Sequence, residues 1–217
     1  MRFFHFETGL DVEIARVIIA GWTGRNAEAV THHINELAAL GVPAPSQVPL
    51  YYRVSNTLLA QGESIEVLGA DTSGEAEPLL LRSNGVLWLG LASDHTDRQL
   101  EAVSVAASKQ ACPKPVSDQL WRFDEVAAHI DDLLLRCHVK EDGEWVLYQE
   151  GTLEGIRPLT QLARQANLQD GDAMLCGTLP AIGPIRPAEA YRMELADKTQ
   201  GRSLRLDYRV NALPVVA

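Results

Sequence analysis

The chain has 217 residues, of which 46% are hydrophobic and 22% are charged, and its formal net charge is −10. This length and composition predict one globular domain over residues 1–217. The acidic balance argues against a nucleic-acid partner, and no apolar run reaches the roughly 18 residues that cross a membrane. Three scattered cysteines and an N-terminus without the pattern of a signal peptide predict a cytoplasmic protein.

The first predicted elements are two strands, at residues 2–7 and 12–21, which we expect to pack onto the rest of the domain, followed by a helix that Asn26 can cap. On this helix, His33 and Glu36 are three residues apart, so their side chains can meet. A histidine oriented by a carboxylate can serve as a general base. From the helix alone, a surface pair without chemistry is the simpler interpretation.

The stretch of residues 75–93 has two arms rich in Leu, Val and Trp around an Asn-Gly dipeptide at 84–85, which favours a two-residue hairpin turn. Antiparallel pairing around this turn places Glu75 opposite Asp94, with Glu77 two residues along the strand. Side chains alternate faces along a strand, and paired residues share a face. The three carboxylates are therefore expected on one face, with Cβ atoms roughly 5–7 Å apart.

Three carboxylates at this spacing repel one another unless protons or a cation intervene. A hard divalent cation with oxygen ligands, Mg²⁺ or else Mn²⁺ or Ca²⁺, answers that repulsion. The alternative is a solvated rim of acidic residues at a strand end. Both faces of the hairpin are apolar beyond the acids, which indicates burial and favours the metal site. Pro78 weakens the prediction, because a bulge or a slip of one residue would send Glu75 and Glu77 to the other face.

Further candidate site residues follow the hairpin. Arg98 comes four residues after Asp94 and can reach the acidic cluster or an anionic ligand beside it. Lys109 can be a buried electrophile or an ordinary surface lysine. Gly177 and Thr178 end a predicted strand, where a hydroxyl beside glycine-exposed N–H groups can hold an oxyanion or a carboxylate. A plain turn has the same sequence.

The second half of the chain continues as short strands with few helices. We expect a helix within residues 121–134, a hairpin over 135–149, a short helix at 158–166 and three strands in the last fifty residues. So many short strands indicate an α+β, mainly β architecture that is rolled or barrel-like.

The candidate residues occur in the order typical of a known family. They form an H-x-x-E pair, an E-x-E pair, D-x-x-x-R, a lysine and a final G-D…G-T-x-P stretch, which are here His33 to Glu36, Glu75 to Glu77, Asp94 to Arg98, Lys109, and Gly171 to Pro184. From about Gly24 to the C-terminus, the chain resembles the fumarylacetoacetate hydrolase family. Ala27, Glu101 and Cys176 depart from the usual Tyr, Gln and Thr, which is typical of a divergent branch.

The resemblance implies a mixed β-roll, Mg²⁺ or a similar cation on Glu75, Glu77 and Asp94, and a homodimer. It implies an enzyme, a metal-dependent hydrolase that cleaves a C–C bond in a small β-dicarbonyl acid of the acylpyruvate type. The roles that it assigns are catalysis by His33, Glu36, Arg98 and Lys109, and substrate binding by Asn26, Gly177 and Thr178.

Two other functions fit the same residues. The metal site can act as a hydratase, decarboxylase or tautomerase on a 2-oxo acid, or the protein can bind a small acid without turnover. In each case the expected partner is a small oxo acid rather than a nucleic acid or a membrane. The sequence leaves open the acyl group, the preferred cation and whether Glu36 or Glu194 orients His33.

Overall fold

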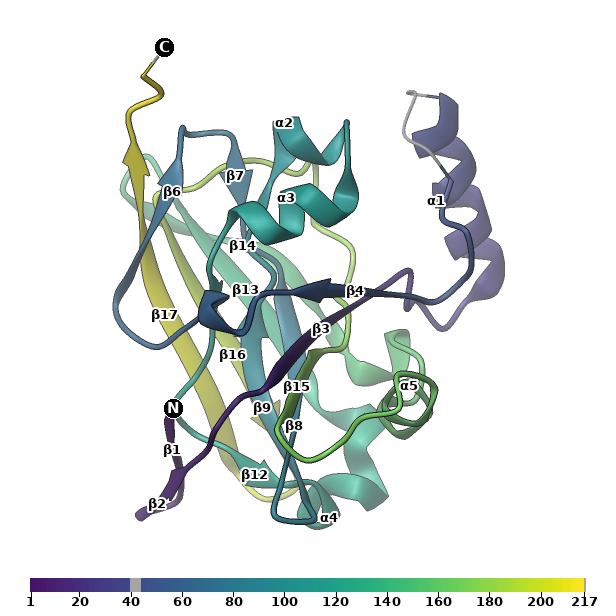
Figure 1. The fold of residues 1–217 in the computed structure, drawn as a ribbon, viewed down its shortest axis with the longest axis vertical. Coiled ribbons are helices and arrows are strands. Elements are labelled where there is room, and N and C mark those ends of the chain that lie inside the picture. The colour runs from purple at the N-terminus through teal and green to yellow at the C-terminus, as the bar shows by residue number, and fades with distance from the viewer. Residues whose placement is uncertain (40–43, 217) are drawn as a thin grey trace.

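The computed structural model describes residues 1–39 and 44–216, without the side chains of residues 33, 36, 37 and 39. Most of its strands form two mixed sheets that pack face to face (Figure 1). The described strands form no closed barrel, so the α+β, mainly β prediction holds as a roll of two sheets. None of the described helices is long and apolar enough to span a membrane.

The first sheet has six strands in the spatial order β12–β9–β8–β15–β3–β4. In chain order they are β3 (Arg16–Gly21), β4 (Leu50–Val54), β8 (Ala76–Ser83), β9 (Val86–Ser93), β12 (Trp121–Arg122) and β15 (Asp172–Leu175). β15 is parallel to β3, and the other neighbours are antiparallel.

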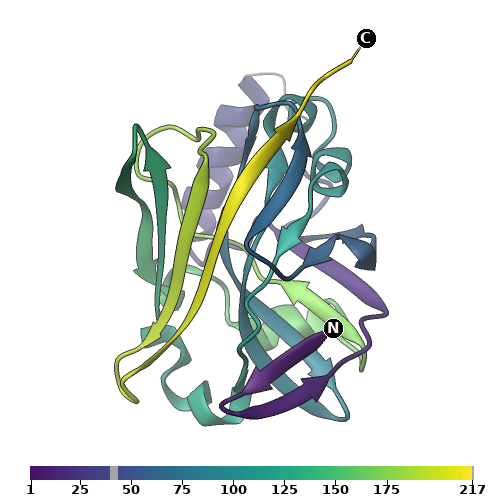
Figure 2. The same ribbon diagram turned by 90° about the vertical axis from the view of Figure 1, so that its left-hand side faces the viewer.

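The second sheet has five strands in the order β14–β13–β16–β17–β6. They are β6 (Ser64–Leu68), β13 (Leu134–Glu141), β14 (Glu144–Thr152), β16 (Ala190–Asp197) and β17 (Arg202–Leu213). Figure 2 shows β17 and β16 running the length of this sheet, with the N-terminal hairpin at the lower end of the molecule. β6 is parallel to β17, and the other pairs are antiparallel.

Shorter elements complete the fold. Three two-stranded sheets are formed by β1 (Arg2–His5) with β2 (Thr8–Asp11), β5 (Leu59–Ala60) with β11 (Lys114–Pro115), and β7 (Thr72–Ser73) with β10 (Thr96–Asp97). The α-helices are α1 (Ala27–Ala39), α2 (Arg98–Glu101), α3 (Val105–Ala111), α4 (Phe123–Val126) and α5 (Leu159–Gln165), and the 3₁₀ turns are η1 (Asn56–Leu58), η2 (Ala127–Asp132) and η3 (Leu153–Gly155).

The hydrophobic core has two parts, one on each face of the six-stranded sheet. Leu80 and Leu89 belong to the cluster between the two sheets, whereas Leu79, Leu81 and Trp88 belong to the cluster on the opposite face. The predicted burial of the 75–93 hairpin on both faces is therefore confirmed. Because alternate residues share a face, Glu77 lies on the side of Leu79 and Leu81, away from the second sheet.

The predicted register of this hairpin is confirmed, with Glu77 opposite Ala92 and no shift along β8 and β9. Pro78 does not disturb it. The Pro78 carbonyl accepts a hydrogen bond from Cys176 N, so its nitrogen faces the same side, beyond the last residue of β15. Pro78 lies opposite Cys176, so the proline forgoes only the reciprocal bond at the very end of this ladder, which is why it is tolerated.

Two local predictions are confirmed only in part. The first strand ends at His5 because Phe6 turns the chain at φ 54°, so residues 8–11 pair back as β2 and β3 begins only at Arg16. The helix expected within residues 121–134 is broken into β12, α4 and η2. It is interrupted at His129, whose φ of −135° is not helical and whose ring binds Asp197 at 3.1 Å. Apolar spacing predicted the buried face there but not these interruptions.

Candidate metal centre

Glu75, Glu77 and Asp94 meet where β8 begins and β9 ends. Each residue contributes one carboxylate oxygen to a group of three oxygens that all lie within 4.8 Å of one another. The pairing of β8 with β9 continues beyond the strands, since Asp94 N donates to Glu75 O at 3.0 Å. Glu77 and Asp94 are buried and Glu75 is partly exposed, so the acids form an inward-facing cluster rather than a solvated rim.

Glu77 is the least compensated of the three carboxylates. Its Oε2 accepts one hydrogen bond, from Gly177 N at 2.7 Å. No described Lys, Arg or His forms an ion pair with it. Burial, together with the nearby charge of Asp94, raises the pKa of Glu77 well above its ordinary value. A bound cation is one way to keep such a carboxylate ionised.

Asp94, in contrast, is held by two lysines. Lys109, from α3, pairs with Oδ2, and Lys114, from β11, lies 3.0 Å from Oδ1. Burial alone would raise the pKa of Asp94, but these two ammonium groups hold it below its ordinary value. Burial would likewise lower the pKa of Lys109, but Asp94, Glu75 and Glu77 raise it, so the ammonium form is favoured.

Lys114 is a site residue that the sequence did not reveal. Its side chain is fully buried, and it donates to His95 O as well as pairing with Asp94. The sequence offered one indication: Lys114 stands between Pro113 and Pro115, where no helical or strand periodicity assigns its side chain to an exposed face. Its position is set by the parallel pairing of β11 with β5, a long-range contact.

Arg98, at the start of α2, lies against the triad, and two of its three guanidinium nitrogens already donate hydrogen bonds. Nε donates to Ser73 Oγ at 2.6 Å, and Nη1 donates to Glu101 Oε2 at 2.7 Å. Nη2 lies 3.5 Å from Glu75 Oε1. The structure therefore places Arg98 where it orients Glu75, and the buried Nη2, which has no hydrogen-bond partner among the described residues, is the donor left for a substrate.

A buried network lies behind Asp94. The ring nitrogens of His95 are 3.0 Å from Tyr208 Oη and 2.8 Å from Thr72 Oγ1, and Tyr208 Oη is 2.9 Å from Ser93 Oγ. Burial and the charge of Lys114 lower the pKa of His95 to about 3, so the imidazole is neutral. The network fixes the chain on both sides of Asp94 without adding charge.

Thr178 lies beside the triad, where its hydroxyl already has partners. It donates to Ala76 O at 2.8 Å and accepts from Gln149 Nε2 at 2.7 Å. Gln149, a buried residue that the sequence did not single out, also accepts from Ala76 N at 2.9 Å. These bonds tie the Gly177 loop to the strand between Glu75 and Glu77. Binding of a substrate carboxylate by Thr178 would compete with them.

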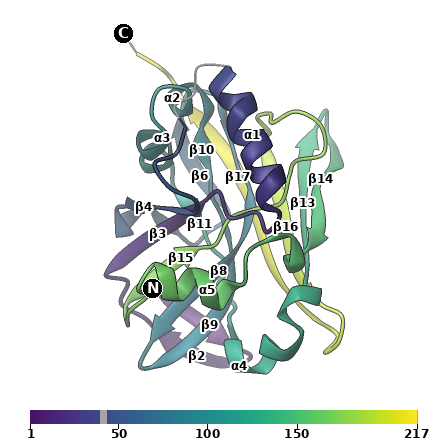
Figure 3. The same cartoon turned by 90° about the vertical axis from the view of Figure 1, so that its right-hand side faces the viewer.

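The predicted residues of α1 are not joined to the triad by any described contact. Asn26 caps the helix, because its Oδ1 accepts from Glu28 N at 3.0 Å and Ala29 N at 3.1 Å. None of the described side chains of α1 is buried. The helix stands apart from the sheets in Figure 1, and Figure 3 shows it at the same end of the molecule as α2 and α3. The side chains of His33 and Glu36 lie outside the described residues, so their pairing stays a prediction.

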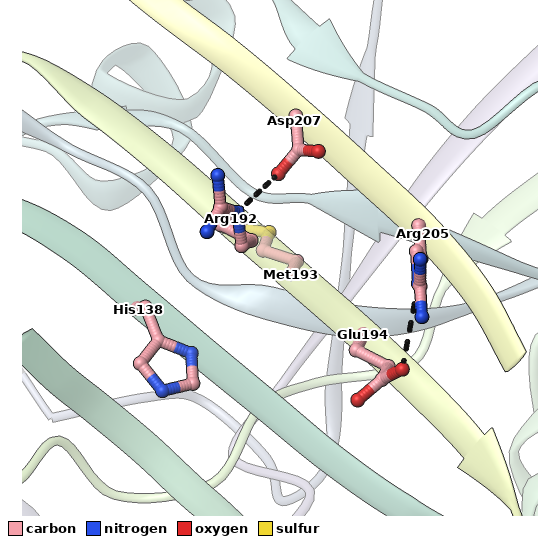
Figure 4. Close-up of a pocket in the computed structure, with 6 residues that line it drawn as sticks. All are labelled: His138, Arg192, Met193, Glu194, Arg205 and Asp207. Carbon is pink, nitrogen blue, oxygen red and sulfur yellow. Dashed lines mark hydrogen bonds and ion pairs between the residues drawn. The ribbon is translucent and has the colours of Figure 1, made fainter. Parts of the chain in front are cut away.

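Glu194, the alternative partner of His33, is placed elsewhere. It lines a hollow of about 410 Å³ on the outer face of the five-stranded sheet, together with His138 (Figure 4). The charges there are paired with one another, Glu194 with Arg205 at 3.6 Å and Arg192 with Asp207 at 3.3 Å. This face is turned away from the core, so Glu194 does not belong to the triad.

The donor set of the triad fits a hard divalent cation. All three groups are carboxylates, which Mg²⁺ and similar ions prefer over nitrogen or sulfur ligands. Lys109 and Lys114 neutralise Asp94, whereas Glu77 has no counter-charge of its own among the described residues. Glu75, Glu77 and Asp94 could therefore hold a metal ion, as their sequence spacing predicted.

Several solved structures have this fold. A yeast protein of the fumarylacetoacetate hydrolase family, ynq8, is 16% identical with a TM-score of 0.67, covering 94% of this chain and 95% of its own. The 2-keto-3-deoxy-D-arabinonate dehydratase complexed with magnesium and 2,5-dioxopentanoate is 17% identical with a TM-score of 0.65, covering 98% and 79%. The 5-carboxymethyl-2-hydroxymuconate delta-isomerase from Mycobacterium smegmatis is 16% identical with a TM-score of 0.64, covering 95% and 81%.

Sequence comparison gives a different kind of match. No curated protein sequence is significantly similar to this chain. One family model matches residues 20–208, and its description is Protein of unknown function (DUF2848). That range contains the whole triad and every predicted site residue. The chain therefore belongs to the DUF2848 family, and it has the fold of the fumarylacetoacetate hydrolase family.

Proposed function

We propose that this protein is a metal-dependent enzyme that hydrolyses a C–C bond in a small β-dicarbonyl acid of the acylpyruvate type. The observation that carries the proposal is the buried triad, in which Glu77 has no cationic partner among the described residues. A further support is that a dehydratase of the same fold was solved with magnesium and 2,5-dioxopentanoate, which is a 2-oxo acid.

Glu75, Glu77 and Asp94 would hold Mg²⁺. When bound, the cation supplies a Lewis acid and a positive charge against the negative charge that develops as the C–C bond breaks. Lys109 is a second source of positive charge. Its ammonium is buried beside the triad, where a charge acts more strongly than it does in water. We therefore assign to Lys109 the stabilisation of the enolate or oxyanion.

The proposed base is His33, oriented by Glu36. It takes a proton from water as the water oxygen bonds to the acyl carbonyl carbon, a role typically worth 10²- to 10⁴-fold in rate. The bond between that carbon and the methylene carbon then breaks, and its electron pair leaves with the pyruvate enolate. A proton returned to the methylene carbon completes pyruvate, and the acyl group leaves as a carboxylic acid.

A second reaction type is favoured by a specific observation. Proteins of this fold include a dehydratase and an isomerase, which work on 2-oxo acids or related hydroxymuconates without cleaving a C–C bond by water. The same triad could therefore serve hydration, decarboxylation or tautomerisation. These reactions share the stabilised enolate and differ in whether water is positioned to attack.

Acetylpyruvate with Mg²⁺ tests the proposal, with products followed by NMR. Hydrolysis gives acetate and pyruvate in equal amounts, whereas decarboxylation or tautomerisation does not give these two products. Glu77→Gln should abolish turnover and weaken Mg²⁺ binding at least 100-fold by calorimetry. Glu66→Gln removes the same charge from an exposed position on β6 and should change neither. Full activity of Glu77→Gln, or of the wild type in excess EDTA, would contradict the metal role.

The base is tested separately. His33→Ala should lower kcat at least 100-fold and leave the Kd for Mg²⁺ unchanged, because the imidazole acts on water rather than on the cation. Glu36→Gln should show a smaller loss of kcat. An unchanged kcat in His33→Ala would show that another group removes the proton.

A further inference from the structure

The guanidinium of Arg98 is neutralised by a carboxylate outside the triad. Glu101 lies three residues further along the chain, and its Oε2 accepts from Arg98 Nη1 at 2.7 Å. The two side chains are 16% and 29% exposed, so the pair is only weakly screened by solvent. On its other side, Arg98 Nη2 lies 3.5 Å from Glu75 Oε1. Through Arg98, Glu101 therefore belongs to the same group of interacting charges as the predicted metal ligands.

The contacts around the triad join seven charged groups into one cluster. Its members are Glu75, Glu77, Asp94, Arg98, Glu101, Lys109 and Lys114. With all seven groups ionised, four are negative and three are positive, so the net charge of the cluster is one negative. A divalent cation changes this to one positive, which a single carboxylate neutralises. Without the charge of Glu101, the loaded cluster would carry two positive charges.

We propose that Glu101 is a specificity-determining residue that restricts the site to oxo acids with a single negative charge. The inference rests on the proposed function, because the charge balance includes the divalent cation. Glu101 acts in two ways. It cancels one positive charge, and it occupies Arg98 Nη1, so a second substrate carboxylate cannot pair with both terminal nitrogens of the guanidinium and has only the buried Nη2 left.

The cost to a dianionic acid follows from the same contacts. A second carboxylate entering beside Arg98 meets Glu101 and Glu75, and like charges brought together in a partly buried site repel strongly. A neutral end in the same position meets no such repulsion. The preferred substrates are therefore 2-oxo acids whose end remote from the 2-oxo carboxylate is uncharged.

A matched pair of ligands isolates this effect. 2-Oxopentanoate and 2-oxoglutarate have the same five-carbon chain and the same 2-oxo acid end, and differ in having a terminal methyl or a terminal carboxylate. Their dissociation constants are measured by calorimetry on protein saturated with Mg²⁺. We expect the wild type to bind 2-oxopentanoate at least tenfold more tightly than 2-oxoglutarate.

Three variants complete the experiment. Glu101→Gln keeps the shape of the side chain and removes its charge, so it should strengthen 2-oxoglutarate binding tenfold or more and leave 2-oxopentanoate binding within about threefold. Glu101→Asp keeps the charge and should retain the wild-type preference. Glu66→Gln, which removes one charge from the exposed surface of β6, controls for net charge and should also retain it.

The outcomes separate this inference from the proposed function. If the wild type binds Mg²⁺ and 2-oxopentanoate, and Glu101→Gln leaves the ratio of the two affinities unchanged, Glu101 does not select for charge and the inference is overturned. If the wild type does not bind Mg²⁺ at all, the proposed metal site itself is overturned. Melting temperatures and Mg²⁺ affinity show whether the variant proteins are folded and loaded.

Discussion

Two carboxylates on neighbouring strands of the six-stranded sheet are equally buried but differently surrounded. Glu77 lies on β8 and Asp172 on β15, at opposite ends of this antiparallel pair, and each is 3% exposed. Asp172 accepts from Arg16 Nε at 2.6 Å and from Gln169 N at 2.6 Å, and its second oxygen also pairs with the guanidinium. Glu77 accepts one backbone hydrogen bond and lies beside two other carboxylates, and it is attracted by the charge of Lys109 without forming an ion pair with it.

The comparison shows that burial of a charge does not by itself mark a functional site. Asp172 is satisfied entirely by groups of its own chain, so it needs nothing from outside. Glu77 is buried to the same extent without a cation of its own, an arrangement that is costly in the apo-protein. The partner that is missing among the described residues, and not the burial, indicates a ligand.

The largest expected difference in stability is between variants that remove the charge of Asp172 or the charge of Glu77. Asp172→Asn leaves the partly buried Arg16 without a carboxylate partner, with only the hydrogen bond from Nη2 to Asn167 O remaining, so the free energy of unfolding should fall by about 3 kcal/mol. Glu77→Gln removes a repulsion, so the free energy of unfolding in EDTA should stay equal or rise. Urea denaturation of both variants in EDTA gives the two values. An equal loss of stability in the two variants would show that Glu77 has a structural partner like that of Asp172.

The comparison is sharpened by pH. Burial and Asp94 raise the pKa of Glu77, so the folded protein holds this proton more tightly than the unfolded chain does. The resulting stability is fully present below the unfolded pKa, near 4.5, and is lost as the pH rises through the folded pKa. In EDTA, the wild type should therefore lose stability relative to Glu77→Gln from about pH 5 upward, by at most about 1.4 kcal/mol per pH unit.

Saturating Mg²⁺ provides the control for this pH dependence. The cation binds the ionised carboxylate and removes the proton from the folded state, so the difference in slope between the wild type and Glu77→Gln should disappear. Urea denaturation between pH 5 and pH 8, with and without Mg²⁺, measures both slopes. Parallel curves in EDTA would mean that Glu77 titrates alike in the folded and unfolded chain.

The triad could be predicted from the sequence because its geometry is local. The Asn-Gly turn at 84–85 sets the register of one hairpin, and alternation along β8 and β9 then decides which side chains share a face. The carboxylates of Glu75, Glu77 and Asp94 all follow from that single pairing. The register needed no knowledge of the rest of the fold.

The surroundings of the triad could not be predicted, because they depend on contacts between distant segments. Lys114 reaches Asp94 through the pairing of β11 with β5, and Gln149 reaches Thr178 from β14. Neither segment has a periodic pattern that indicates its neighbour. The pairing of Arg98 with Glu101 was within reach of the sequence at a spacing of three residues, but its burial was not.

The smallest expected effect on stability concerns the two glycines that lie next to these carboxylates. Gly177 donates to Glu77 and Gly171 precedes Asp172, and both have a positive φ, 95° and 85°. A Cβ at Gly177 would lie 1.7 Å from Thr23 Oγ1, whereas the nearest atom to a Cβ at Gly171 is Ala15 Cβ at 3.3 Å. Gly171→Ala should therefore cost about 1 kcal/mol of stability for the backbone alone, and Gly177→Ala about 1 kcal/mol more.

The additional cost should become smaller in the double variant Thr23→Ala with Gly177→Ala, compared with Thr23→Ala alone, because the hydroxyl at 1.7 Å is gone while the Cβ of residue 23 remains at 2.9 Å. Urea denaturation measures this difference. Calorimetry should further show weaker Mg²⁺ binding in Gly177→Ala and unchanged binding in Gly171→Ala, since only Gly177 N orients a predicted ligand. Equal costs for the two glycines would mean that the loop at Gly177 relaxes around the new methyl group. Unchanged Mg²⁺ binding in Gly177→Ala would mean that its N–H does not hold Glu77 in position.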